Sequence, residues 1–316
     1  MKEESVGDSV DPTRTDSCAL RDWSQFIADW NPDVHKPVHI HFAPDSGFYA
    51  EHGGIVLRSA FQPIFSPEDS RPVGHEALLR ASDGAGHSIS PETVFARTEE
   101  LDAAVLLDRV CRMLHVMNFA RQNPGEAKLY LNMGSRNLMA VHSGNHGSFF
   151  RPLLQMCRVH ADAIVLEITE SRISDHDRLV EAAASYTKQG FKIAIDDFGA
   201  RDSNFDRLWM LSPHVVKMDR TLIVKADQDA RVRRMLPKLV EIVHELEAEV
   251  IFEGIETQAQ QAIAREAGTD MVQGFLRARP CATIVKSAVA PMAAASSSLL
   301  MYSLAAAQRT QTANLR

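Results

Sequence analysis

The stretch KIAIDDFGARDSNFD, residues 192–206, begins as an apolar strand and then places two aspartates side by side. Asp196 and Asp197 stand where the strand pattern gives way to a loop. Successive side chains of a strand normally point to opposite faces of a sheet, but this alternation can break where the strand ends. We therefore expect both carboxylates to reach the same end of a sheet.

The same pattern, a short apolar strand and then a helix-length segment, recurs along the body of the chain. Strands are predicted within residues 56–65, 72–79, 128–133, 163–169, 191–197, 214–219, 249–255 and 271–276. Eight such units predict an α/β fold of the (β/α)₈ TIM-like barrel type, for which about 250 residues is typical.

Two helices between these strands carry clear end signals. Ser90 is expected to cap the helix that begins at Pro91, because a serine side chain accepts from free amides and proline fits the first helical position. Gly190 is expected to close the helix that begins near residue 177.

Polar side chains end or interrupt seven of the eight predicted strands. They are Glu76, Asn132, Glu167, Asp196, Asp197, Lys217, Glu253 and Gln273. Any one of them alone would fit an ordinary solvated strand end. In a barrel, however, the carboxyl ends of the strands meet at one mouth, where so many carboxylates would repel one another.

Bound divalent cations are the simplest way to neutralise such a group of carboxylates. Adjacent aspartates suit a site for two cations about 3.5–4 Å apart, which can activate water for in-line displacement at a phosphoryl group. Oxygen ligands without a cysteine or histidine cluster favour Mg²⁺ or Mn²⁺ over Zn²⁺. The residues thus predict metal-assisted attack of water.

Composition narrows the class of partner and compartment. The 316 residues carry 34 basic and 41 acidic side chains, a net charge of −7, which argues against binding a nucleic-acid duplex. The four cysteines form no close pair and the N-terminus has no apolar signal segment, so a cytoplasmic location is expected. Residues 287–307 are uncharged, but they are rich in Ala and Ser and contain Pro291, which argues against a membrane span.

Seven motifs then carry a family resemblance. They are HEALLRA at 75–81, LNMGS at 131–135, LEITES at 166–171, IDDFG at 195–199, VVKMDR at 215–220, FEGIET at 252–257 and VQGFLRARP at 272–280. In this order and spacing the chain resembles the EAL-domain cyclic di-GMP phosphodiesterases. The resemblance implies a barrel over residues 51–282, an N-terminal extension over 1–50 and an Ala/Ser-rich tail over 283–316.

The resemblance also implies a reaction and a set of roles. The reaction is hydrolysis of cyclic di-GMP to the linear dinucleotide pGpG, with two Mg²⁺ or Mn²⁺ ions. By similarity the metal ligands are Glu76, Asn132, Glu167, Asp196, Asp197 and Glu253. Catalytic roles fall to Lys217, Glu253 and Glu256. Substrate contacts fall to Gln62, Leu78, Arg80, Gln273 and Pro280.

One loop departs from the family pattern. After IDDFG, this chain has Arg201 and Asp202 where the family usually has a glycine and an aromatic residue. By similarity Glu170 orders this loop, which joins the site to a homodimer interface. Two alternatives stand beside an active phosphodiesterase. One is a cyclic di-GMP receptor or protein-interaction module on the same fold, which the altered loop favours. The other is an unrelated metal-dependent barrel hydrolase, against which the ordered motif series argues. A regulatory protein partner is a further expectation, because residues 1–50 are too few for a separate sensor domain.

Overall fold

The computed structural model describes most of the chain. The described residues are Trp23, Phe26, Ile27 and the ranges 38–68, 71–97, 101–134, 150–169, 176–200 and 205–286. The expectations for Glu170, Arg201, Asp202 and residues 287–316 lie outside these residues. Within the described residues, no helix is both long and apolar enough to span a membrane.

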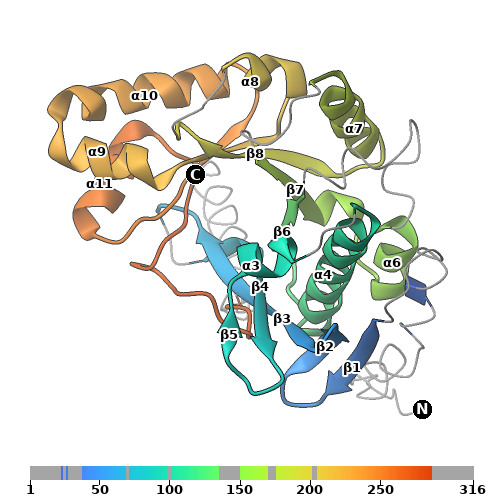
Figure 1. The fold of residues 1–316 in the computed structure, drawn as a ribbon. Coiled ribbons are helices and arrows are strands. Elements are labelled where there is room, and N and C mark those ends of the chain that lie inside the picture. The colour runs from blue at the N-terminus through green and yellow to red at the C-terminus, as the bar shows by residue number, and fades with distance from the viewer. Residues whose placement is uncertain are drawn as a thin grey trace, which may run out of the picture. The chain divides into compact units, whose positions relative to one another are not determined.

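Eight strands close into a barrel (Figure 1). Around the barrel they follow the order β3, β11, β10, β9, β8, β7, β6 and β4, and β4 pairs back onto β3. Their bounds are β3 Ile55–Phe65, β4 Pro72–Asp83, β6 Lys128–Met133, β7 Ile164–Thr169, β8 Lys192–Phe198, β9 Val215–Met218, β10 Glu249–Phe252 and β11 Met271–Val272. The predicted barrel is confirmed, and each of the eight strands falls within or beside its predicted range.

Within the barrel, strand β3 runs antiparallel to its two neighbours, β4 and β11. The other neighbouring strands of the barrel are parallel to each other. The connection from Phe65 to Pro72 explains this direction. A parallel pair needs a crossover of about a dozen residues or more, and this connection is much shorter, so β3 and β4 form a hairpin. Val272 pairs with Phe65 and completes the ring.

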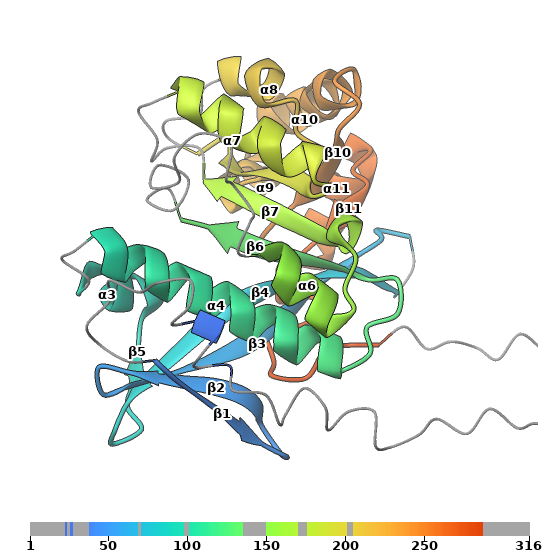
Figure 2. The same cartoon turned by 90° about the vertical axis from the view of Figure 1, so that its right-hand side faces the viewer.

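Helices cover the outside of the barrel (Figures 1 and 2). Their bounds are α3 Pro91–Ala96, α4 Leu101–Arg121, α6 Phe150–Cys157, α7 His176–Lys188, α8 Asp206–Leu211, α9 Arg220–Gln228, α10 Ala230–His244 and α11 Gln258–Ala267, with a 3₁₀ turn at Ala161–Ala163. Buried apolar side chains between helices and strands form the main core.

A smaller apolar layer fills the barrel interior. It takes one side chain from each of seven strands: Ile64, Tyr130, Val165, Ala194, Val215, Ile251 and Met271. All seven are nearly or fully inaccessible to solvent. This layer excludes water below the polar residues at the strand ends.

The predicted helix ends are present. The Ser90 side chain accepts a hydrogen bond from the Thr93 amide, and Pro91 is the first residue of α3. The helical segment predicted from Ser90 onward is divided into α3 and α4. Gly190 has φ of +94°, the left-handed conformation that glycine adopts most easily, just beyond the end of α7.

Residues before the barrel add two strands to its sheet. Strands β1 (His39–Ala43) and β2 (Gly47–His52) form a hairpin, and β2 pairs antiparallel with β3. On the other side of the β3–β4 pair, the short strand β5 (Ser88–Ile89) pairs with β4. Helix α4 covers one face of this extended sheet (Figure 2).

A buried polar network joins the hairpin to α4. The Asn118 side chain accepts a hydrogen bond from the Phe48 main-chain amide and donates one to the Phe48 carbonyl, both at 2.8 Å. It also donates to the Ser59 hydroxyl at 3.3 Å, and that hydroxyl lies 2.8 Å from Nδ1 of His115. The network satisfies main-chain groups of β2 that would otherwise be buried without partners.

Replacing Asn118 with Ala should lower the free energy of unfolding by about 2–3 kcal/mol, because two buried main-chain groups of Phe48 would lose their partners. Urea unfolding followed by circular dichroism measures this loss. Glu181→Ala, at an exposed position of α7, is the matched control. Equal stability of the two variants would show that the network does not hold the hairpin.

His115 should make the stability of the protein fall in acid. Burial, together with the positive charge of Arg80, lowers the pKa of His115 to about 3, against an ordinary value of 6.5. The unfolded chain therefore takes up a proton below pH 6.5 that the folded protein does not, which costs about 2 kcal/mol by pH 5.

The His115→Gln variant isolates this effect. The difference in free energy of unfolding between wild type and variant should shift by about 2 kcal/mol between pH 7 and pH 5 in favour of the variant. A difference independent of pH would show that His115 titrates alike in the folded and unfolded states.

Candidate active site

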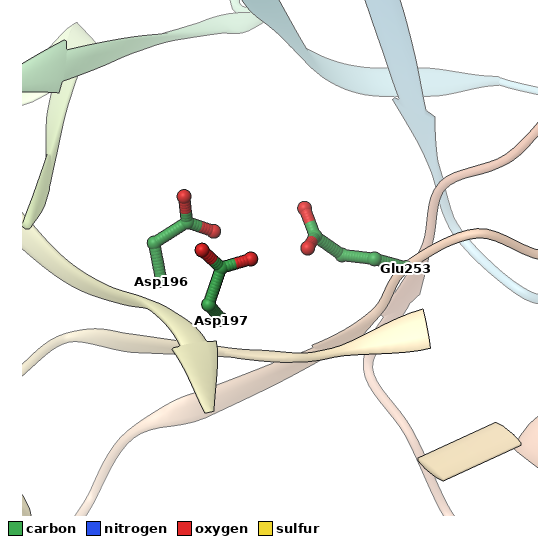
Figure 3. A group of neighbouring side chains, drawn as sticks. All are labelled: Asp196, Asp197 and Glu253. Carbon is green, nitrogen blue, oxygen red and sulfur yellow. The ribbon is translucent and has the colours of Figure 1, made fainter. Parts of the chain in front are cut away.

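Polar residues from five barrel strands and from the segments just after β10 and β11 meet at the carboxyl end of the barrel. Glu76 lies within β4, Asn132 within β6, Glu167 within β7, Asp196 and Asp197 within β8, Lys217 within β9, Glu253 just after β10 and Gln273 just after β11. Figure 3 shows the carboxylates of Asp196, Asp197 and Glu253 directed toward one another. Oxygen atoms from these three residues lie within 4.8 Å of each other.

An irregularity in β8 brings both aspartates to the mouth. The pairing of β8 with β9 shifts register between Ile195 and Phe198, and Asp197 has φ of +57°. This left-handed conformation is uncommon for a residue other than glycine, although aspartate tolerates it better than most. The predicted break in side-chain alternation is confirmed, and it leaves Asp196 buried and Asp197 exposed.

The ammonium group of Lys217 lies at the centre of the site. Its Nζ atom is 2.6 Å from Glu167, 2.7 Å from Glu253, 3.0 Å from Asp196 and 3.6 Å from Glu76. The Lys217 side chain is only 1% exposed. One cation thus contacts carboxylates from four different parts of the barrel.

Two amide side chains hold Glu76 in place. Asn132 donates to Oε1 of Glu76 at 3.2 Å, and Gln273 donates to Oε2 at 2.8 Å. Because both oxygens already accept from an amide, the Glu76 carboxylate has a defined orientation toward Lys217.

The surroundings change the acidity of several of these groups. Burial and the charges of Glu76 and Asp196 raise the pKa of Glu167 well above its ordinary value, although Lys217 acts in the opposite direction. Burial and the charges of Asp196 and Glu76 also raise the pKa of Glu253, and Lys217 again acts in the opposite direction. Partial burial and the adjacent Asp196 charge raise the pKa of Asp197 to about 6, although the residue as a whole is exposed.

Lys217 remains charged in this environment. Burial alone would lower its pKa, but the carboxylates of Asp196, Glu167, Glu253 and Glu76 raise it well above the ordinary value. Its ammonium group is therefore a permanent positive charge inside the mouth of the barrel.

The donor set fits divalent cations. Five carboxylates (Glu76, Glu167, Asp196, Asp197 and Glu253) meet one ammonium group, so the fully ionised site has a net charge of −5 + 1 = −4. Oε2 of Glu167 is buried and has no hydrogen-bond partner among the described residues. Unpaired buried carboxylate oxygens and excess negative charge are what Mg²⁺ and Mn²⁺ neutralise.

The remaining predicted residues lie around this centre. Gln62 is directly opposite Glu76 on β3, and its amide is 3.5 Å from the Ala278 carbonyl. Leu78 and Arg80 follow Glu76 along the same side of β4, with Leu78 half-buried and Arg80 exposed. Pro280 is half-buried in the segment after β11.

Glu256 has a different partner from the other predicted catalytic residues. It forms an ion pair with Arg220 at 2.7 Å, and both side chains are partly exposed. The described contacts do not join Glu256 to Lys217 or to the carboxylates around it. Arg220 was not among the residues predicted from the sequence, although Arg220 is the last residue of the motif VVKMDR and lies three positions after Lys217.

The sequence profile of the EAL domain matches residues 54–280. The chain belongs to the EAL-domain family. The match contains the whole barrel, from β3 to the segment after β11, and every residue of the candidate site.

Individual EAL proteins are similar at modest identity. A probable cyclic di-GMP phosphodiesterase, PdeD of Escherichia coli (strain K12), is 28% identical over 225 residues, which cover 69% of this chain and 40% of PdeD. A standalone EAL protein from Vibrio cholerae O395, solved with c-di-GMP bound, has 25% identity and a TM-score of 0.65, with 73% of this chain and 94% of that chain covered.

A manganese and cyclic di-GMP complex of Klebsiella pneumoniae BlrP1 has the same fold, with a TM-score of 0.65 at 23% identity, over 78% of this chain and 59% of that one. The chain spans less than two thirds of the length of several curated relatives: 28% of YkoW and 55% of YkuI, both from Bacillus subtilis (strain 168), and 40% of PdeD. The similarity therefore concerns the EAL domain and not the further parts of these relatives.

Replacing Lys217 with Met should lower the free energy of unfolding by about 3–5 kcal/mol, because several buried carboxylates would lose the cation with which they pair. The measurement is urea unfolding at pH 8 in the presence of a chelator. The control is Lys225→Met, which removes the same charge from an exposed side chain of α9. If both variants lost the same small amount, the ion pairs of Lys217 would not stabilise the barrel.

Proposed function

We propose that this EAL protein hydrolyses one phosphodiester bond of cyclic di-GMP to give linear pGpG, with Mg²⁺ or Mn²⁺ as cofactor. The observation that carries the proposal is the group of five carboxylates around Lys217 at the carboxyl end of the barrel. The named relatives, which include probable cyclic di-GMP phosphodiesterases, support the choice of substrate.

The proposed metal ligands are Glu76, Asn132, Glu167, Asp196, Asp197 and Glu253. Cations bound there would activate water and neutralise charge on the phosphate. The irregularity in β8 contributes by presenting two adjacent carboxylates to the same space. The amides of Asn132 and Gln273 contribute by fixing the direction of the Glu76 carboxylate.

Lys217 has two proposed roles. Its ammonium group keeps four carboxylates together, which preserves the geometry of the site. Its positive charge also attracts the negative charge that develops on the phosphate oxygens during attack. A charged donor that is already fixed in place stabilises that charge without reorganisation in the transition state.

Raised carboxyl pKa values fit proton handling in this reaction. Glu253, whose pKa is raised by burial, is the proposed acceptor of a proton from the attacking water. Glu256 is retained as a proposed contributor through its ion pair with Arg220, which anchors the loop after β10.

Substrate contacts are proposed on the side of the mouth formed by β3, β4 and the segment after β11. They are Gln62, Leu78, Arg80, Gln273 and Pro280. Arg80 would bind a phosphate, since a guanidinium group matches the geometry of phosphate oxygens. The proposed barrel boundaries are residues 51–282, and the proposed assembly is a cytoplasmic homodimer whose interface loop is ordered by Glu170.

The decisive assay is incubation of the purified chain with cyclic di-GMP and Mg²⁺ or Mn²⁺. Linear pGpG should form, and EDTA should stop the reaction. Glu76→Gln should reduce kcat by about a thousandfold or more, because it removes a ligand charge from a site that depends on cations. Glu241→Gln, an exposed change on α10, should leave turnover unaltered.

Two results would contradict the proposal. Turnover by Glu76→Gln at the wild-type rate would remove Glu76 from the metal site. Tight binding of cyclic di-GMP by the wild type without cleavage, in either metal, would favour a receptor on the same fold, and the altered loop at Arg201 would be its first suspected cause.

A further inference from the structure

Strands β1 to β4 form a sheet that extends beyond the mouth of the barrel, which we call the wall. Strand β4 pairs with β6 only as far as Ala77, but it continues to Asp83, and β3 accompanies it along this whole length. The hairpin of β1 and β2 widens the wall on the far side of β3. The EAL profile begins at residue 54, so this hairpin lies outside the family match.

One face of the wall is covered and the other is continuous with the site. On the covered face, Phe48 and Ser59 contact Asn118 and His115 of α4. Residues one position away point to the opposite face, and residues two or four positions apart share a face. Arg58 is therefore on the face opposite α4, and Arg80 is on the same side of β4 as Glu76, one row of residues beyond Leu78.

Four side chains from four strands lie in one row on this face. Arg58 and Arg80 are directly opposite each other on β3 and β4. The Arg58 guanidinium lies over the Tyr49 ring, 5.0 Å from its centroid. On the next strand the His41 ring stacks against Tyr49, with centroids 5.0 Å apart.

The two arginines have no carboxylate to neutralise them among the described residues. Among the described residues, Arg80 donates a hydrogen bond to the main-chain carbonyl of Leu79, and the Arg58 guanidinium contacts the Tyr49 ring. Glu51, the acidic neighbour on β2, is instead 3.8 Å from His41. Like charges directly opposite on neighbouring strands are destabilising, so this pair reduces the stability of the fold unless an anion lies between them.

We infer that Arg58 is a further substrate-binding residue, which holds a phosphate of the cyclic dinucleotide together with Arg80. The inference rests on the proposed function. Arg80 is four positions beyond Glu76, about 13 Å along the strand, so the anion held in this row belongs to the part of the substrate that is not cleaved. A cyclic dinucleotide has a second phosphodiester that Arg58 and Arg80 can hold while the first lies at the carboxylates, whereas a mononucleotide has a single phosphate.

Tyr49 is a positioning residue in this arrangement. Its ring supports the guanidinium of Arg58 from one side and is itself supported by His41. An arginine stacked on an aromatic ring has less freedom to lose when it binds, and its planar group remains free to make two hydrogen bonds to phosphate. The hairpin thus contributes to affinity through a side chain that does not itself contact the ligand.

The test compares Arg58→Ala with wild type in steady-state hydrolysis of cyclic di-GMP. Loss of a charged hydrogen-bond donor should raise KM about tenfold or more. The value of kcat should change by less than about threefold, because the reacting phosphate is elsewhere. Arg231→Ala, which removes the same charge from an exposed position at the start of α10, should leave KM unaltered.

Thermal unfolding separates binding from a structural role. Without substrate, Arg58→Ala should melt at the wild-type temperature or above it, because the opposed positive charges are relieved. A lower melting temperature with an unchanged KM would mean that Arg58 only supports the sheet. Tyr49→Phe should retain the wild-type KM and Tyr49→Ala should raise it, as expected if only the ring is needed.

Failure of this inference and failure of the proposed function give different results. If wild type hydrolyses cyclic di-GMP and Arg58→Ala has the same KM, the inference is wrong and the proposed function stands. If wild type does not hydrolyse it, the proposed function fails, and calorimetric titration with cyclic di-GMP in Ca²⁺ decides the inference. A tenfold weaker affinity of Arg58→Ala would then support it, while equal affinity, or no binding by wild type, would overturn it.

Discussion

The ammonium group of Lys217, buried among four carboxylates, is the interaction on which the mouth of the barrel depends. Neither sign of charge would be stable there alone, because a buried ion without a partner loses several kcal/mol of solvation. The carboxylates come from β4, β7, β8 and the end of β10, so the contacts of one side chain require that these segments keep their register. The same contacts therefore fix the register of the barrel strands and the geometry of the site.

Below this charged layer, hydrophobic side chains fill the barrel interior, and this contrast affects the acidity of the groups above it. The seven side chains from Ile64 to Met271 exclude water from beneath the carboxylates. Charges at the mouth consequently act in a medium of low polarity, which raises the carboxyl pKa of Glu167 and strengthens its attraction to Lys217. The irregularity in β8 adds Asp197 at the exposed rim, where a second cation or its water would be accessible.

The wall built from β1 to β4 gives this EAL protein an asymmetric mouth. Helices surround the parallel part of the barrel, but the β3–β4 pair extends beyond it, with α4 on one face alone (Figure 2). The buried Asn118 network attaches a hairpin from outside the family match to this wall. This hairpin contributes Phe48 and Ala50 to the hydrophobic core, and it also places polar and aromatic side chains beside the site.

Local sequence patterns by themselves determined the eight barrel strands, the Ser90 cap and the carboxylates at the strand ends. These features depend on neighbours in the chain: apolar runs, a serine before proline, and an acidic residue where an apolar run stops. The antiparallel direction of β3 could also be predicted from the sequence, because the segment between Phe65 and Pro72 is too short for a parallel crossover.

Only the tertiary structure decided which charges meet. Lys217 is far in sequence from Glu76, and Glu256 pairs with Arg220 although the two residues are 36 positions apart. The row of His41, Tyr49, Arg58 and Arg80 depends on the register of three strand pairings, and a shift of one residue in any of them would turn a side chain to the other face. Strand register is set by packing and hydrogen bonds across the whole sheet, and for that reason a pattern within one strand does not reveal it.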